Sequence, residues 1–183
     1  MKSARILGFR LAAGAALCAL ALAACQTQSQ PSAVQAGGVT QVQAQAICST
    51  LAVARNTPDF NMLGNVLSDD VQTQDPFSST PMTSLEQLKQ FFLGTQSAFP
   101  DFSMRYDDVW VSGNRIIAHW TATGTHQGLW FDIEATGNNV TISGLSVMKV
   151  ESGKVTEQAS YFDLLSVARQ LGARLTLAPV DSL

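Results

Sequence analysis

Apolar and polar residues alternate with a period of two over 115–128. Because successive side chains of a strand point to opposite faces, a strand here places Trp120 and His126 on one face, which is apolar until it reaches His126. Such a face is typical of the wall of a closed pocket with a polar group near its end. Similar alternation predicts four strands in all, over 102–111, 115–125, 139–150 and 155–162. Hairpin turn signals connect the first strand to the second, at Gly113-Asn114, and the third to the fourth, at Ser152-Gly153.

Helical spacing of apolar residues replaces this alternation at both ends of the region. It predicts helices over 42–55, 59–67, 85–98 and 164–171, and a short strand is predicted over 71–75. Capping signals support these bounds: Thr57 before Pro58, Ser84 with Gln87 as a capping box, Asp163 as an N-cap and Gly172 as a stop. Helices followed by antiparallel strands indicate an α+β domain, with helices packed on one face of a curved sheet.

The N-terminus has the composition of an export signal. Three basic residues precede an uncharged apolar run over 11–24, which is too short to span a bilayer comfortably. The run ends in Leu22-Ala23-Ala24-Cys25, which resembles the lipobox of bacterial lipoproteins. That resemblance implies a signal peptide over 1–24 and lipidation of Cys25, and two or more acyl chains anchor a protein stably to a membrane. The alternative is an ordinary secretory signal.

The residues after Cys25 bear on location and domain organisation. Gln26, rather than aspartate, follows the cysteine, which resembles lipoproteins sorted to the outer membrane. We therefore expect the protein in the bacterial cell envelope, at the outer membrane and facing the periplasm. Residues 25–41 are uncharged and rich in Gln, Ser, Ala and Gly, so they predict a flexible linker. One domain over 42–172 and a tail over 173–183 complete the chain.

Charge and cysteine content exclude several classes of function. Without the predicted signal, eight basic and fourteen acidic residues remain, a net charge of about −6 with no basic run, so no nucleic-acid partner is expected. Cys48 is then the one free thiol, which rules out an intramolecular disulfide, and its helical spacing predicts a small buried hydrophobe rather than a nucleophile. No metal-ligand cluster, nucleophile elbow, phosphate loop or dinucleotide fingerprint occurs, so neither a metal nor a cofactor is expected.

Five motifs follow one another along the predicted domain: F-P-D-F at Phe99, R-I-I-A-H-W-T-A-T-G-T-H-Q-G at Arg115, A-T-G-N-N-V-T-I-S-G at Ala135, E-S-G-K-V-T-E-Q at Glu151 and Y-F-D-L-L-S-V-A-R-Q-L-G at Tyr161. In this order they resemble the SnoaL-like polyketide cyclase family, whose members are often called ester cyclases. The resemblance implies the nuclear transport factor 2-like fold, a cone in which a bent antiparallel sheet wraps a pocket plugged by helices. The periodic pattern indicates the same architecture independently.

The same resemblance implies a reaction whose residues this chain lacks. Characterised cyclases of the family close a ring by an intramolecular aldol step, in which a carboxylate removes a proton next to a carbonyl. The aspartate expected on the last strand falls at Ser160, its partner histidine falls at Ser146, and a third polar position, commonly histidine, falls at Gln74. A serine hydroxyl titrates far too high to act as a base unaided. The aldol cyclase mechanism is therefore not expected here.

Seven residues are predicted to contact a ligand inside the cone: Trp120, His126, Trp130, Ser146, Met148, Ser160 and Phe162. Trp130, in the long connection over 127–138, is predicted as a lid over the pocket mouth. Ser146 and Ser160 either bind a ligand oxygen or only enlarge the cavity. His126 and Asp163 are the candidate catalytic residues, the first as a general base near neutral pH. Alternatively, His126 is a neutral, hydrogen-bonded histidine at the rim, and Asp163 only caps a helix.

Three functions remain open on these observations. The first in rank is the binding of a small apolar molecule in the cone of a membrane-tethered domain, without chemistry. The second is an ester cyclase, isomerase or hydrolase that uses His126 or Asp163, and the third is a non-catalytic interaction module. Fold alone cannot decide among them, since this fold hosts many unrelated functions. A homodimer is kept open as well.

Overall fold

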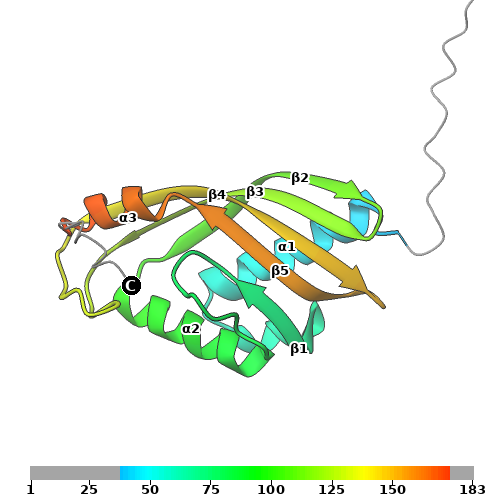
Figure 1. The fold of residues 1–183 in the computed structure, drawn as a ribbon, viewed down its shortest axis with the longest axis horizontal. Coiled ribbons are helices and arrows are strands. Elements are labelled where there is room, and N and C mark those ends of the chain that lie inside the picture. Colours follow the sequence, from blue (N-terminus) through cyan, green and yellow to red (C-terminus); the bar gives the residue numbers. More distant parts are fainter. Residues whose placement is uncertain (1–37, 174–183) are drawn as a thin grey trace, which may run out of the picture. The chain divides into compact units, whose positions relative to one another are not determined.

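The structure, a computed structural model, describes residues 38–173 and contains one five-stranded sheet (Figure 1). Its strands are β1 (Leu67–Gln74), β2 (Ser103–Ser112), β3 (Arg115–Thr125), β4 (Asn139–Glu151) and β5 (Lys154–Phe162). They lie side by side in the order β1-β5-β4-β3-β2. β1 runs parallel to β5, and the three other neighbouring pairs are antiparallel. The two predicted hairpins, β2 with β3 and β4 with β5, are confirmed and account for four of the strands.

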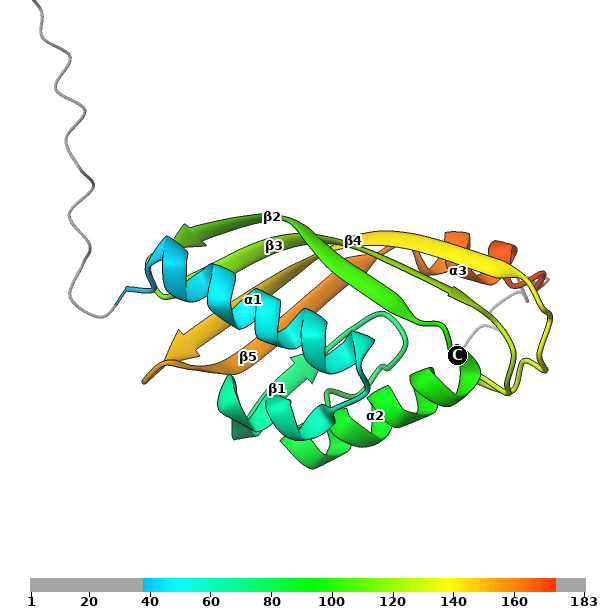
Figure 2. The same ribbon diagram turned by 180° about the vertical axis from the view of Figure 1, so that it is seen from behind.

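The helices lie mostly on one side of this sheet. They are α1 (Gln41–Asn56), the short 3-10 helix η1 (Phe60–Asn65), α2 (Leu85–Ala98) and α3 (Leu164–Gln170). Figures 1 and 2 show the sheet arching over α1 and α2, while α3 lies beside β4. Because one face of the sheet and the apolar faces of both long helices must leave water, they close on each other. The result is the predicted α+β cone.

The core forms where α1 and α2 meet the concave face of the sheet. On β3, the residues at every second position from Ile116 to Gly124 are buried and their neighbours are only half-buried, as the alternation predicts. Ile47 and Leu51 of α1 are buried in the same cluster. Cys48 lies between them with 2% of its surface exposed, and burial raises the pKa of its thiol to about 12. The prediction of a small buried hydrophobe is confirmed.

Capping side chains set most helix ends, and tertiary pairing sets the rest. Ser84 accepts the backbone N–H of Gln87 as predicted, but the Gln87 side chain accepts from the backbone of Thr83 at 2.8 Å, so the reciprocal half of the capping box is absent. The helix predicted over 59–67 is wrong in type and length. It is a 3-10 helix that ends at Asn65, because Leu67 already pairs with Val155 of β5. β1 is correspondingly longer than the predicted 71–75.

Several sequence predictions lie outside the described residues. These are the signal peptide over 1–24, the lipidated Cys25, most of the linker over 25–41 and nearly all of the tail over 173–183. Between residues 38 and 173, no helix has the length and apolar character needed to cross a membrane.

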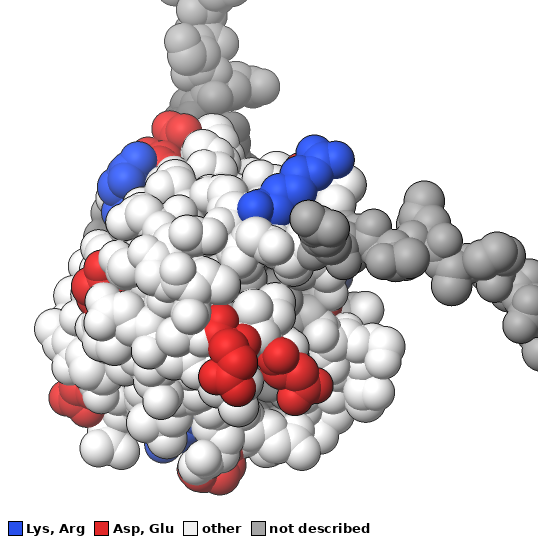
Figure 3. Space-filling view, turned by 90° about the vertical axis from the view of Figure 1, so that its left-hand side faces the viewer, with Lys and Arg blue, Asp and Glu red and all other residues white. Residues whose placement is uncertain are grey.

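Figure 3 views the end of the molecule where α3 lies, and most of the surface there carries neither acidic nor basic side chains.

Candidate ligand-binding site

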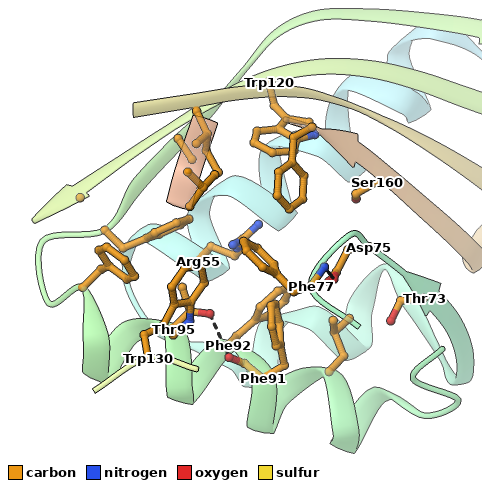
Figure 4. A pocket seen from close by; sticks show the side chains of 18 of the residues that line it. Arg55, Thr73, Asp75, Phe77, Phe91, Phe92, Thr95, Trp120, Trp130 and Ser160 are labelled. Atoms are coloured by element: carbon orange, nitrogen blue, oxygen red, sulfur yellow. Dashed lines mark hydrogen bonds between the residues drawn. The ribbon is translucent and has the colours of Figure 1, made fainter. Parts of the chain in front are cut away.

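A cavity lies between the concave face of the sheet and helix α2 (Figure 4). Its volume is about 100 Å³, well above the roughly 10–15 Å³ needed to hold one water molecule. Its walls come from the three α-helices, β1, the three central strands and the connections over 75–84, 99–102 and 126–138. Its position, between a sheet and the helices that cover it, is one where proteins bind small molecules.

Aromatic rings form most of the cavity wall. They belong to Phe77, Phe91, Phe92, Phe99, Phe102, Trp120, Trp130 and Phe162. Phe77 lies among several of them, with ring centroids 4.6 Å from Trp130 and 4.8 Å from Phe162. Offset and edge-to-face rings at these distances attract one another and present a continuous apolar surface. The cavity is therefore suited to the apolar body of a ligand.

A tight turn after β3 directs Trp130 into the cavity. The backbones of Trp130 and Ile133 exchange two hydrogen bonds, and Phe131 and Asp132 between them both have left-handed backbone conformations, with φ of 46° and 62°. Residues other than glycine rarely adopt this backbone conformation, so the turn is strained. The ring of Phe131 is half-exposed and stacks on Phe77 at 5.3 Å. The lid function of Trp130 stays a prediction, but the tryptophan does line the cavity.

Ser146, Ser160 and Trp120 form a hydrogen-bonded chain at the sheet side of the cavity. The indole Nε1–H of Trp120 donates to Ser146 Oγ at 3.0 Å, and the two serine Oγ atoms are 2.9 Å apart. Ser146 pairs directly with Ser160 across β4 and β5. Ser160 lines the cavity, whereas Ser146, with 1% of its surface exposed, lies behind it. Ser160 is thus a small polar group in an aromatic wall, and Ser146 supports it from behind.

Arg55 is a cavity residue that the sequence pattern did not single out. It occupies the last turn of α1, and its guanidinium lies over the rings of Phe92 and Phe102, 4.4 and 4.6 Å from their centroids. Its Nη1 donates to Met104 Sδ at 3.2 Å. Burial lowers the pKa of Arg55 to about 10, so the side chain still carries its charge at neutral pH. Its proximity to the aromatic residues could not be inferred from local spacing.

Asp75 brings a carboxyl group to the same wall. One of its oxygens accepts the backbone N–H of Phe77 at 2.8 Å, closing a turn over 75–77. Burial raises the pKa of Asp75, while the N–H groups of Phe77 and Ser78 and the charge of Arg55 act in the opposite direction. Thr73 lines the cavity too, and its buried hydroxyl has no partner among the described residues. In the sequence, Asp75 is followed by Pro76 and Phe77.

The family of the chain follows from a comparison over most of its length. The family model described as SnoaL-like polyketide cyclase matches residues 45–171. This chain belongs to the SnoaL-like polyketide cyclase family. None of the curated proteins compared with the chain matches it. The match includes every described strand and the greater part of α1, so the cavity lies within the family domain.

Three solved structures with the same fold are each less than 25% identical to this SnoaL-like chain. TsrD from Streptomyces laurentii is 24% identical, with a TM-score of 0.68 over 74% of this chain and 99% of TsrD. IdmH from Streptomyces antibioticus is 23% identical, with a TM-score of 0.63 over 72% and 99%. A Catenulispora acidiphila protein with a ketosteroid isomerase-like fold, solved in complex with trimethylamine, is 18% identical, with a TM-score of 0.61 over 73% and 97%. At these identities the likeness shows the fold alone.

Four of the seven residues predicted to contact a ligand line the cavity of this SnoaL-like domain. They are Trp120, Trp130, Ser160 and Phe162. The other three, His126, Ser146 and Met148, are not among the residues that line it. Ser146 is covered by the indole that it accepts from, and Met148 is fully buried in the core cluster that contains Leu51 of α1. The strand faces were predicted correctly, but the packing against them was not.

His126 lies on the expected face of the sheet but is separated from the cavity by Phe99. The two rings stack with centroids 5.1 Å apart, and no part of His126 is exposed. His126 Nδ1 lies 3.1 Å from Thr136 Oγ1 and accepts the backbone N–H of Thr136 at 3.3 Å. Nε2 has no partner among the described residues. His126 is therefore on the predicted face of β3, but it does not form part of the cavity wall.

Asp163, the second catalytic candidate, also lies away from the cavity lining. Its carboxylate accepts the backbone N–H of Ser166 at 3.0 Å and caps α3, which is the structural alternative that the sequence offered. No group of three or more His, Cys, Asp or Glu residues between 38 and 173 is arranged to hold a metal ion. Neither catalytic candidate thus reaches a molecule in the cavity directly.

Proposed function

We propose that this SnoaL-like domain binds a small, largely apolar molecule in its cavity without transforming it. The observation that carries the proposal is the Ser146–Ser160 pair, two hydroxyls 2.9 Å apart at the positions where the family resemblance leads us to expect an acid/base pair. Ser146 already accepts the indole N–H of Trp120. A hydroxyl pair without an adjacent base cannot remove a proton next to a carbonyl. The aromatic wall around the serines binds an apolar body, and Ser160, whose Oγ accepts from Gln158 Nε2 at 3.2 Å, contributes a polar group to that wall.

A cavity-filling variant tests whether binding takes place in the cone. Ala122 lines the cavity from β3, whereas Thr121, its neighbour on the same strand, faces the opposite side of the sheet. We expect the neutral apolar dye Nile red to bind the wild-type protein and Thr121→Leu, and to bind Ala122→Leu at least tenfold more weakly. Circular dichroism establishes that both variants are folded. Equal dye binding by the two variants would place the dye outside the cavity and contradict the proposal.

Acid/base catalysis is a second candidate function, and one observation favours it. Asp75 presents a carboxyl with a raised pKa to the cavity wall, as a general acid or base requires. His126 and Asp163, the candidates from the sequence, do not line the cavity. Mass spectrometry of molecules that co-purify with wild type and with Asp75→Asn separates the two functions. The same species on both proteins supports binding alone, and a precursor that accumulates only on Asp75→Asn supports an enzyme.

The location of the cavity in the cell is also a proposal. Lipidation of Cys25 would tether the domain to the outer membrane through the segment over 25–41, within reach of apolar molecules that enter the envelope. We expect the mass of the N-terminal peptide to show a diacylated or triacylated cysteine. Cys25→Ser should move the protein from the membrane fraction into the soluble fraction. An unmodified peptide that begins after an ordinary secretory cleavage site would rule out the tether.

A further inference from the structure

Arg55 is a charged group in the cavity wall whose hydrogen-bonding capacity is mostly unused. A guanidinium has five N–H donors, and the acceptor that Arg55 finds is the thioether sulfur of Met104, a weak one. None of the ion pairs in the described part of the chain includes Arg55. Removing a charge from water without an opposite charge is costly, so a guanidinium placed in this way favours an anionic partner.

The contacts that hold Arg55 leave most of its donors free. Phe92 and Phe102 attract the guanidinium through their ring faces, which fixes its position without using an N–H group. In Figure 4, the nitrogen atoms of Arg55 lie in the middle of the cavity, between Trp120 and Phe92. Arginine offers a planar pair of donors that matches the two oxygens of a carboxylate. The side chain is thus preorganised for bidentate binding.

Asp75, the carboxyl group in the same wall, does not take up this capacity. Its oxygen accepts the backbone N–H of Phe77 within its own turn, and it forms no ion pair with Arg55. Burial also disfavours the charged form of Asp75. The neutral donors and acceptors of the wall, such as Ser160, carry no charge that could replace an anion. The cavity therefore combines a guanidinium that forms no ion pair among the described residues with a mainly aromatic lining.

We propose that the cavity selects small carboxylic acids with an aromatic or similarly flat apolar body, and that Arg55 binds the carboxylate. The apolar body then lies against Phe77, Trp130 and Phe162, a cluster in which the ring of Phe77 packs on the other two with centroids 4.6 and 4.8 Å apart. This inference rests on the proposed function, because it names the chemical class of the molecule that the cavity binds. It differs from that proposal in requiring a negative charge on the ligand.

Two probes with the same body and different head groups test the charge requirement. The anion 2-naphthoate and the neutral 2-naphthamide are titrated into the full-length protein in detergent, with isothermal calorimetry as the readout. The wild-type protein should bind 2-naphthoate roughly tenfold to a hundredfold more tightly than the amide, the effect of a charge-assisted hydrogen-bond pair. Arg55→Gln should bind the two probes equally. Arg115→Gln, a matched change at an exposed arginine, should keep the wild-type preference.

The outcomes separate this inference from the proposed function. Equal binding of both probes to the wild-type protein overturns the carboxylate preference, while Nile red binding that Ala122→Leu abolishes still supports a neutral ligand. A preference that survives in Arg55→Gln overturns the role of Arg55. Binding of neither probe overturns the inference as well, and the dye experiment then decides the proposed function alone. The wild-type preference needs no variant, so poor folding of Arg55→Gln cannot protect the inference.

Discussion

A single methyl group at Gly144 should destabilise the sheet side of the cavity. Gly144 lies on β4, opposite Trp120 on β3 and Phe162 on β5. The Cβ atom of an alanine at this position would lie 2.5 Å from Trp120 Cζ2 and 2.6 Å from the carbonyl oxygen of Tyr161. A Cβ atom does not approach non-bonded atoms so closely, and the oxygen of Tyr161 belongs to the backbone. Gly144→Ala therefore forces the indole, the strand or both to move.

The size of the effect follows from what Trp120 must give up. The indole is 6% exposed, packs against Phe162 with ring centroids 5.9 Å apart and donates to Ser146 at 3.0 Å. Overpacking a well-filled core costs about 1–3 kcal/mol. Losing the indole hydrogen bond in a buried position adds about 1 kcal/mol. We expect Gly144→Ala to lower the free energy of unfolding by about 2–4 kcal/mol.

Urea denaturation followed by far-ultraviolet circular dichroism measures this loss. The midpoint should fall while the slope stays unchanged, because the surface exposed on unfolding is the same. Gly94→Ala is the matched control, since Gly94 lies in α2 and an added Cβ meets no atom within 4 Å. The control should raise stability by about 0.5–1 kcal/mol, the usual gain from replacing glycine inside a helix.

A double-mutant cycle isolates the contact with the indole. Trp120→Phe removes the Cζ2 and Cη2 atoms that the new methyl group would meet. Gly144→Ala should then cost at least about 1 kcal/mol less in the Trp120→Phe background than in wild type. An equal cost in both backgrounds, or a change within about 0.5 kcal/mol of wild type, would refute the argument from close packing.

Three further predictions concern single groups. Cys48 should resist alkylation in the folded protein and react after unfolding in urea, because burial raises its thiol pKa to about 12; peptide mapping checks this. Thr125 donates two hydrogen bonds that lower the pKa of Asp101. The stability from Asp101 is present above its ordinary pKa of 3.8 and is lost as pH falls further, so Asp101→Asn should flatten acid unfolding below about pH 4. Thr73→Val should leave stability unchanged or raise it by about 1 kcal/mol in urea denaturation, because it removes an unpartnered buried hydroxyl.

Each of these three has a clear contrary result. Alkylation of native Cys48 at the rate of the unfolded chain would contradict its burial. Asp101→Asn with the same acid unfolding curve as wild type would show that the bonds from Thr125 do not favour the charged carboxylate. A loss of more than about 1 kcal/mol in Thr73→Val would mean that the hydroxyl has a partner that the described residues do not include.

Local sequence rules were sufficient for most elements of this fold. β3 has the predicted bounds because its alternation is regular and the turn signal Gly113-Asn114 precedes it. Asp163 and Gly172 mark the ends of α3 because a side-chain acceptor and a left-handed residue are needed there whatever the rest of the chain does. The rules failed at 59–67, where pairing of β1 with β5 ends the helix early.

The candidate site was predicted only in part, for a physical reason. Trp120 and Phe162 follow from the strand faces, which are a local property. Whether a residue on such a face touches the cavity depends on what packs in front of it, and Phe99 from another segment covers His126. Arg55, in contrast, lines the cavity although no local pattern indicates it. Its position in the last turn of α1 indicates only a basic residue that interacts favourably with the helix C-terminus.

The sequence by itself determined most of the helices and strands and the buried faces of the strands, because period and capping act over a few residues. The tertiary structure alone decided which buried groups meet. It placed the guanidinium of Arg55 over two rings from α2 and the segment before β2, and it placed Asp75 in the same wall. Contacts between distant segments depend on the curvature of the sheet and on side-chain volume, and no local pattern records either.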